Sequence, residues 1–256
     1  MAARTDQVTD PAIAAALLLA RRGQAYYSRK LNELSDADFD GPTLLGDWDR
    51  RHLIAHVGLN ARAITRLVEW ARTGVETPMY ASPEQRADEI DFSATLPAHA
   101  LRNLSDHAAI HLTVEWRDLP AEAWTNEVRT GLGRIVPVSE TVWMRTREVW
   151  IHAVDLGNGG RFEDFPPELL DALLADILGA WDRRRDAEGL PRYLLDVVDR
   201  DGDPLGAETD AGSVRDEEEL VVRGTAAALT RWATGRGADG VLTGRGEPAS
   251  PAPRWL

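Results

Sequence analysis

The stretch at residues 139–156 reads SETVWMRTREVWIHAVDL and combines a helical pattern with two potential metal ligands. Its apolar residues recur at helical spacing, and Glu148 and His152 stand four residues apart, on one face of the predicted helix. A carboxylate and an imidazole in this arrangement can bind the same divalent metal ion. The stretch therefore predicts a long helix that contributes two metal ligands.

A second helix is predicted over residues 50–73, where His52 and His56 again stand four residues apart. A histidine from this helix could supply a third ligand. At about 100° per residue, His56 lies about 60° from the centre of the apolar stripe and His52 about 100°, so His56 should point closer to the core. His107 and His111 form a similar pair on a third helix, and the spacing alone does not choose among these combinations.

The polar side of residues 139–156 also has a simpler interpretation. Four polar residues border the apolar stripe: Thr141, Arg145, Glu148 and His152. Such a strip is commonly a solvated helix edge, here with an Arg145–Glu148 ion pair of little energetic value. Trp143 and Trp150 on the same helix favour a setting beside the core instead.

Composition limits the classes of function. The 256-residue chain has 42 acidic and 29 basic residues, a net charge of -13 and no cysteine. The negative charge disfavours nucleic acid as the main partner, and the lack of cysteine excludes disulfides and a cysteine nucleophile. No apolar run approaches the roughly 20 residues that span a bilayer, and the N-terminus has no signal-peptide pattern. We therefore expect a cytoplasmic protein without a membrane partner.

The order of predicted elements indicates two domains. Long amphipathic helices are expected to begin near residues 11, 50, 97 and 139, with a short helix after a capping box at Ser82–Gln85. Residues 120–137 are expected as a loop or an irregular extended segment. The strongest break is GNGG at residues 157–160, so the domains are predicted as residues 1–158 and 159–256.

The second domain is predicted to mix helices and strands. A helix should begin near residue 166, strands should cover residues 193–198 and 219–223, and a short helix at 225–234 should end at Gly235. The predicted fold class is α+β with two domains, a four-helix bundle followed by a smaller α+β domain.

Two arginines in this domain lie between glycines. They are Arg236 in GRG at residues 235–237 and Arg245 in GRG at residues 244–246. An arginine on an accessible backbone suits a carboxylate ligand, but the simpler interpretation of the first motif is a glycine helix cap followed by an exposed arginine. The sequence does not rank the two arginines.

Several segments resemble one enzyme family. They are HLIAHVGLN at 52–60, TPMY at 77–80, WMRTREVWIHAVDL at 143–156, GRGADG at 235–240 and the tail PRWL at 253–256. These segments resemble the mycothiol-dependent maleylpyruvate isomerases, whose wider relatives are DinB-like metal-binding four-helix bundles. The C-terminal domain of this family is similar to sterol-carrier modules. One departure is DWD at residues 47–49, where relatives often have Gly-Trp-Thr or Gly-Trp-Ser, and aspartate caps a helix equally well.

The resemblance implies a site, two cofactors and a reaction. The site would be a divalent metal, usually zinc, held by His56, Glu148 and His152, with Arg236 as the catalytic or substrate-binding arginine. The reaction would be cis–trans isomerisation of maleylpyruvate to fumarylpyruvate, in gentisate degradation, by addition of the mycothiol thiolate, bond rotation and elimination. The expected partners are mycothiol and a small dicarboxylate, and a monomer is compatible with the sequence. Two alternatives stay open: a mycothiol S-transferase and a non-catalytic module that binds a metal or another ligand.

Overall fold

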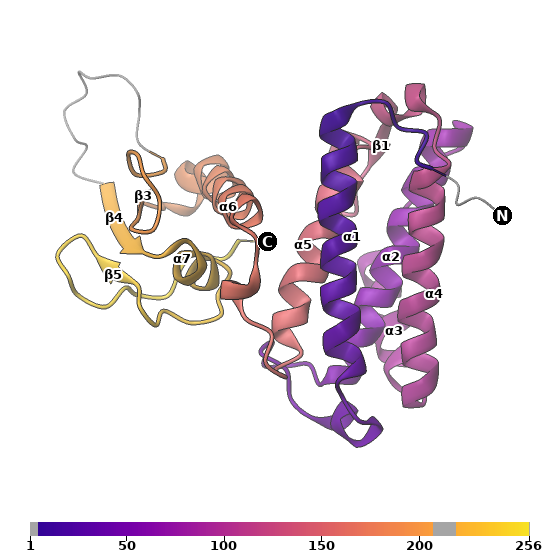
Figure 1. The fold of residues 1–256 in the computed structure, drawn as a ribbon, viewed down its shortest axis with the longest axis horizontal. Helices are drawn as coiled ribbons and strands as arrows, with labels where there is room; N and C mark the ends of the chain where they lie inside the picture. The colour runs from indigo at the N-terminus through magenta and orange to yellow at the C-terminus, as the bar shows by residue number, and fades with distance from the viewer. Residues whose placement is uncertain (1–4, 207–218, 256) are drawn as a thin grey trace. The chain divides into compact units, whose positions relative to one another are not determined.

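The computed structural model describes residues 5–206 and 219–255. Leu256, the last residue of the PRWL segment at 253–256, lies outside the described residues. The fold is α+β, as predicted, and contacts divide the chain into two compact units, Met1–Gly160 and Arg161–Leu256 (Figure 1).

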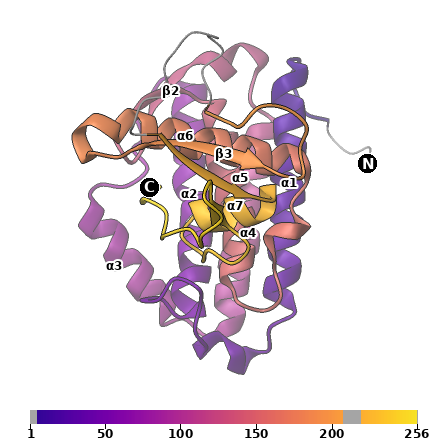
Figure 2. The ribbon, with the colours of Figure 1, turned by 90° about the vertical axis from the view of Figure 1, so that its left-hand side faces the viewer.

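The first unit is a four-helix bundle. Its long helices are α1 (Pro11–Asn32), α2 (Arg50–Thr73), α4 (Ala98–Arg117) and α5 (Glu140–Asp155). They run side by side, with α2 packed mainly on α4 and α1 mainly on α5 (Figure 1). The short helix α3 (Pro83–Ala94) packs on α2 and runs along the outside of the bundle (Figure 2). The predicted helix starts at 11, 50, 97 and 139 are each within one residue of these bounds.

Capping residues explain where these helices begin. Asp10 and Asp49 each accept a hydrogen bond from a backbone N–H in the first turn of α1 and α2, at 2.8 and 3.0 Å. Ser82 caps α3 by accepting from the Gln85 N–H at 3.1 Å. The predicted capping box is nevertheless incomplete, because the Gln85 side chain accepts from the N–H of Ala81 and not from that of Ser82.

The segment 120–137 is more regular than predicted. After the 3-10 turn η2 (Ala121–Thr125), strand β1 (Glu127–Arg129) pairs with β2 (Ile135–Pro137) in an antiparallel hairpin. Val128 and Val136 face each other across the two strands, and both are buried. The expectation of a loop or irregular segment is therefore wrong, because two paired valines give these short strands a buried face.

Close packing of α1 on α5 depends on Gly23. A Cβ atom at this position would lie 2.4 Å from Nε1 of Trp150, so a larger residue would force the two apart. The Trp150 indole N–H donates to the Leu19 carbonyl at 3.2 Å, and its ring stacks on Tyr26 with centroids 5.2 Å apart. These contacts hold α5 in place along its middle turns.

The second unit combines two helices with a small sheet. Helix α6 (Pro167–Glu188) leads into a three-stranded sheet of order β3-β4-β5, and α7 (Ala226–Ala233) packs on α6 and on the sheet. Strands β3 (Arg192–Val197) and β4 (Glu219–Gly224) are parallel, and β5 (Leu242–Thr243) is antiparallel to β4. The sequence predicted β3, β4 and both helices but not β5.

Aromatic side chains hold this second unit together. Trp181 on α6, Tyr193 on β3 and Trp232 on α7 lie with ring centroids 4.8 to 5.9 Å apart. The Trp181 indole N–H donates to the Arg254 carbonyl at 3.1 Å, and that of Trp232 donates to the Ser250 carbonyl at 2.7 Å. The proline-rich tail is therefore fastened to both helices of its unit.

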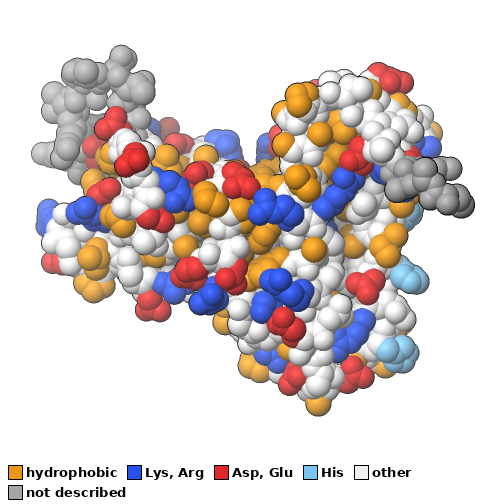
Figure 3. All heavy atoms as spheres, in the orientation of Figure 1, with side chains coloured by type: hydrophobic (Ala, Val, Ile, Leu, Met, Phe, Trp, Pro, Cys, Tyr) orange, Lys and Arg blue, Asp and Glu red, His pale blue; other side chains and the backbone are white. Residues whose placement is uncertain are grey.

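Charges of both signs cover the visible surface of each unit. Acidic and basic side chains are interspersed in Figure 3, with apolar side chains between them. Some of these charges pair, as Arg21 and Asp6 do at 2.6 Å. Within the described ranges, no helix is long and apolar enough to cross a membrane.

Candidate metal centre

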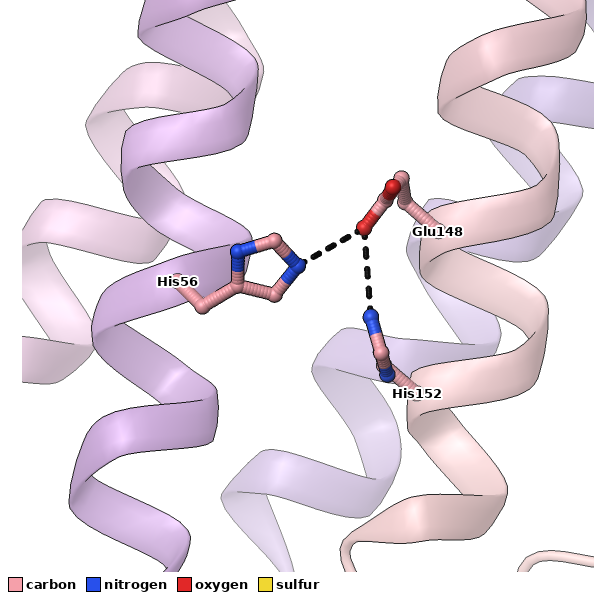
Figure 4. A group of neighbouring side chains, drawn as sticks. All are labelled: His56, Glu148 and His152. Atoms are coloured by element: carbon pink, nitrogen blue, oxygen red, sulfur yellow. Dashed lines mark hydrogen bonds and ion pairs between the residues drawn. The ribbon is translucent and has the colours of Figure 1, made fainter. Parts of the chain in front are cut away.

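Two helices of the bundle bring His56, Glu148 and His152 together. His56 lies on α2, while Glu148 and His152 lie one turn apart on α5, and the three side chains point toward one another (Figure 4). Glu148 Oε2 is 2.9 Å from His56 Nε2 and 3.2 Å from His152 Nε2. One potential ligand atom from each residue lies within 4.8 Å of the other two. The two histidine-bearing stretches singled out in the sequence therefore meet in space.

The chemistry of this donor set fits a divalent metal ion. Two imidazole nitrogens and one carboxylate oxygen are ligands that zinc accepts at distances of about 2 Å, and the three atoms lie close enough together to bind one ion. Catalytic zinc sites commonly use three protein ligands and keep the fourth position for water or substrate. The three residues could therefore hold a metal in a catalytic rather than a saturated structural arrangement.

Burial and mutual contact shift the pKa values of the three groups. Burial by itself would raise the pKa of Glu148, but His56 and His152 outweigh it and hold this pKa well below its ordinary value. Burial would lower the pKa of His152, but hydrogen bonds to Asp155 and Glu148 raise it to about 9. For His56, burial outweighs the nearby Glu148 and lowers the pKa. Near neutral pH and without a metal, these shifts favour a Glu148 carboxylate, a protonated His152 and a neutral His56.

Asp155 orients His152 from behind. Its Oδ2 lies 2.9 Å from His152 Nδ1, and the Asp155 side chain is completely buried. Because Nδ1–H donates to this carboxylate, Nε2 is the nitrogen that faces Glu148. Carboxylate–histidine pairs of this kind orient ligands in metal sites. Sequence reasoning missed Asp155, although its spacing of three residues from His152 puts it on the same helix face.

Arg145 is enclosed by the bundle one turn before Glu148. It is 2% exposed, and burial lowers the pKa of its guanidinium to about 10 although Glu148 acts in the opposite direction. Nη1 donates to the Val57 carbonyl at 2.8 Å and to Asn60 Oδ1 at 3.0 Å, and Nη2 donates to Gln24 Oε1 at 2.9 Å. The simpler interpretation of this strip as a solvated helix edge is therefore wrong, because neutral oxygens of α1 and α2 surround the guanidinium.

Three further side chains approach the His56 ring or its neighbours. The Trp48 ring centroid is 5.2 Å from that of His56, and Arg86 Nη2 lies 3.3 Å from His56 Nδ1. The Arg86 guanidinium also lies over the Tyr80 ring, 5.5 Å from its centroid. Sequence reasoning proposed none of these as site residues. Tyr80 ends the TPMY segment and Trp48 lies in the DWD segment, whereas no local pattern marks Arg86.

His52, His99 and His107 do not join this group. His52 is half-buried, and its Nδ1 lies 2.6 Å from Asp49, the residue that caps α2. His99 and His107 are exposed on α4. His56, by contrast, is 6% exposed, so the helical-wheel expectation that it points closer to the core than His52 is confirmed.

His111 belongs to a second group on the outside of the bundle. Its potential ligand atom lies within 4.8 Å of those of Glu69 on α2 and Glu115 on α4. His111 is exposed, and Glu115 Oε2 already lies 3.6 Å from Arg72 Nε. Arg72 thus already pairs with one of the carboxylates in this group. This pairing makes the group a weaker metal site than the one around Glu148.

Arg236 follows α7 in the second unit. Gly235 before it has a φ of 81°, which helices often adopt at their ends, and the Arg236 side chain donates to the Thr234 carbonyl. The glycine cap of the simpler interpretation is therefore present. A catalytic or substrate-binding role of Arg236 stays a prediction, as does the choice between Arg236 and the exposed Arg245.

Comparisons with known proteins cover both units. Residues 20–157 match the family model of the mycothiol maleylpyruvate isomerase N-terminal domain. The crystal structure of a mycothiol-dependent maleylpyruvate isomerase is similar over 95% of this chain and 97% of its own, with 44% identity and a TM-score of 0.83. A histidine-to-alanine mutant of an isomerase of that name matches at 43% identity, with the same coverage and TM-score. A comparison with curated proteins finds no match. By its sequence and its fold, the chain belongs to the mycothiol-dependent maleylpyruvate isomerase family.

Proposed function

We propose that this chain is a mycothiol-dependent cis–trans isomerase that converts maleylpyruvate to fumarylpyruvate. The observation that carries this proposal is 44% identity, over 95% of the chain, to an isomerase of that name. The convergence of His56, Glu148 and His152 supports it, because a fold alone does not define a function. Zinc as the metal and a cytoplasmic location belong to the same proposal.

The role proposed for the bundle is to hold the metal and orient its ligands. A bound divalent metal lowers the pKa of a coordinated thiol and so favours the thiolate at neutral pH. His56 and His152 present their Nε2 atoms, and Glu148 presents a carboxylate oxygen. Asp155 keeps the His152 ring in one orientation, and Arg145 ties α5 to α1 and α2 beside these ligands.

The reaction needs a thiol that the chain does not contain. Maleylpyruvate has a cis double bond conjugated to a carbonyl, with a carboxylate at each end. Mycothiol would supply a thiol that adds to the alkene carbon, and elimination after rotation of the resulting single bond returns the trans isomer and the free thiol. Because the chain has no cysteine, that thiol has to come from a bound molecule. Negative charge develops on the substrate during addition, so cationic side chains should stabilise it.

Arg236 is proposed as one such cation. The support is the resemblance of GRGADG at residues 235–240 to the family, together with the chemistry of the side chain. A guanidinium can bind a carboxylate through two parallel N–H···O bonds, which an ammonium group cannot do. Arg236 would bind a substrate carboxylate or stabilise the charge that develops after addition.

Turnover of maleylpyruvate, followed by absorbance with and without mycothiol, tests the proposal. We expect wild type to require mycothiol, and we expect His56→Ala to lose both bound zinc and activity because one of three ligands is gone. His52→Ala is the matched control, since it removes a histidine one turn away on α2 that lies outside the group and should keep the zinc. Turnover by wild type without mycothiol would contradict the thiol mechanism.

The same assay separates the proposed function from its alternatives. Free mycothiol should stay constant during turnover, because elimination returns it. Steady depletion of mycothiol would instead indicate a mycothiol S-transferase. A protein that binds zinc fully but turns over no maleylpyruvate would support a non-catalytic metal-binding module.

In the described part of the chain, the group around Glu148 offers three potential metal ligands. A structural zinc site commonly has four protein ligands, so this number argues against a saturated structural site.

A further inference from the structure

Arg86 is a cation that lies beside the candidate metal centre. It lies on α3, partly exposed, with Nη2 3.3 Å from His56 Nδ1 and its guanidinium over the Tyr80 ring. Among the described residues, no ion pair joins Arg86 to an acidic side chain. This is unexpected in a chain with 42 acidic and 29 basic residues, where other arginines such as Arg51 pair with aspartate.

Comparison with Arg145 shows why the position of Arg86 matters. Arg145 also has neutral partners, but it is 2% exposed and donates to three oxygens. Arg86 donates to His56 Nδ1 at 3.3 Å and also hydrogen-bonds the Tyr80 side chain, and it keeps part of its surface open to solvent. A guanidinium has five N–H donors, so Arg86 retains donors for a ligand. Arg145 is thus a structural cation, whereas Arg86 is available to bind an anion.

The His56 ring links Arg86 to metal binding. A neutral imidazole has one nitrogen that accepts and one that donates, and here Nδ1 accepts from Arg86 while Nε2 faces Glu148. If the lone pair of Nε2 is used for a metal ligand bond, the proton must reside on Nδ1. Nδ1 then no longer accepts, and the hydrogen bond from Arg86 is lost. With a metal on Nε2, the Arg86 guanidinium would therefore be released from His56 while it stays against Tyr80.

We propose that Arg86 binds a carboxylate of the substrate next to the metal centre. This inference rests on the proposed function, in which the substrate is a dicarboxylate. A guanidinium fork matches a carboxylate through two parallel hydrogen bonds, and the Tyr80 ring restricts the orientations of that fork. Arg86 would thus be a binding residue supplied by the bundle itself, separate from any role of Arg236.

Binding of an unreactive dicarboxylate to zinc-loaded protein tests this role without catalysis. The probe is heptanedioate, which is saturated and has the chain length of maleylpyruvate, and its affinity is measured by titration calorimetry. We expect Arg86→Gln to retain zinc and to bind heptanedioate about 10- to 100-fold more weakly, as for loss of a charge-assisted hydrogen-bonded contact. The KM for maleylpyruvate should rise by a similar factor. Arg86→Lys should recover part of the affinity, because the charge remains while the planar fork is lost.

Arg62→Gln is the matched control, since it removes the same charge from an exposed position of α2 and should bind the probe as wild type does. Heptanedioate affinity of Arg86→Gln within twofold of wild type, or no binding by wild type, would overturn the inference. Loss of zinc from both Arg86 variants would also overturn it and would make Arg86 a support for His56. If wild type binds heptanedioate through Arg86 but does not isomerise maleylpyruvate, the proposed function fails and the carboxylate site stands.

Discussion

Replacing Asp155 by asparagine should change how zinc binding depends on pH. The Asp155 carboxylate is completely buried and accepts the Nδ1–H of His152 at 2.9 Å. Asparagine has nearly the same shape and can still accept this hydrogen bond through its amide oxygen, but it carries no charge. The substitution therefore isolates the effect of the carboxylate charge on His152.

Two opposite effects follow from the loss of this charge. In the wild type, hydrogen bonds to Asp155 and Glu148 outweigh burial and raise the pKa of His152 to about 9, so a proton competes with zinc at neutral pH. At pH 7.5 a pKa of about 9 weakens apparent zinc affinity by about 30-fold relative to the deprotonated group. In Asp155→Asn the pKa should fall toward the ordinary value of about 6.5, which removes most of this competition. The substitution also has an opposite effect on zinc affinity. Loss of a carboxylate that hydrogen-bonds a metal-binding histidine lowers metal affinity by about 10- to 100-fold.

The net expectation is similar zinc affinity for the two proteins near pH 7.5 and about 10- to 100-fold weaker binding by Asp155→Asn near pH 9.5. Wild-type affinity should rise about tenfold per pH unit between about pH 7 and pH 9, whereas that of the variant should change little. Competition with a chromophoric chelator measures both profiles, and Asp88→Asn, at an exposed position of α3, is the control. Parallel profiles for wild type and Asp155→Asn would refute the reasoning.

Four more results are expected. Arg236→Ala should keep its zinc and lose most turnover, and retained turnover would discard its proposed role. His111→Ala should bind as much zinc as wild type by elemental analysis, because His111 is exposed and Glu115 beside it already lies near Arg72; loss of one equivalent would reveal a second site. Gly23→Ala should lower the free energy of unfolding by about 1–3 kcal/mol in urea, since its Cβ would lie 2.4 Å from Trp150 Nε1, and an unchanged midpoint would argue against close packing there. In metal-free protein the pKa of His152 is raised to about 9, against about 6.5 in the unfolded chain. This difference contributes stability that is complete below about pH 6.5 and is lost as pH rises through about 9. Urea denaturation midpoints that increase over this pH range would contradict the raised pKa of His152.

Local signals account for most of the bundle and for the choice of His56. Asp49 indicated the start of α2 because a cap acts on backbone groups within a few residues. The 3.6-residue period placed His56 inward of His52, and the structure shows 6% exposure for His56 and a half-buried His52. Glu148 and His152 were paired by their spacing on one helix. Each of these inferences needs information from a single helix.

Features that depend on distant partners were missed or misread. Arg145 was paired with Glu148 in the simpler interpretation because that was its visible neighbour, yet its hydrogen-bond partners Asn60 and Gln24 are 85 and 121 residues away. Arg86 reaches His56 across 30 residues of sequence, from a helix whose own pattern identifies only its cap. The hairpin at residues 127–137 and strand β5 are too short to show a period of their own.

The contact between Gly23 and Trp150 limits how this metal centre could be transferred to a designed protein. Grafting His56, Glu148 and His152 onto two helices of another bundle would copy the donors but not the spacing between backbones. Here α5 is held by α1, a helix that supplies none of the three donors, through a position that has no room for a Cβ. A larger residue there would clash with the helix that carries Glu148 and His152 and so disturb the position of both donors, and designed sites tolerate errors of only about 0.5 Å. The smallest portable unit is therefore three helices, one of which contributes no metal ligand.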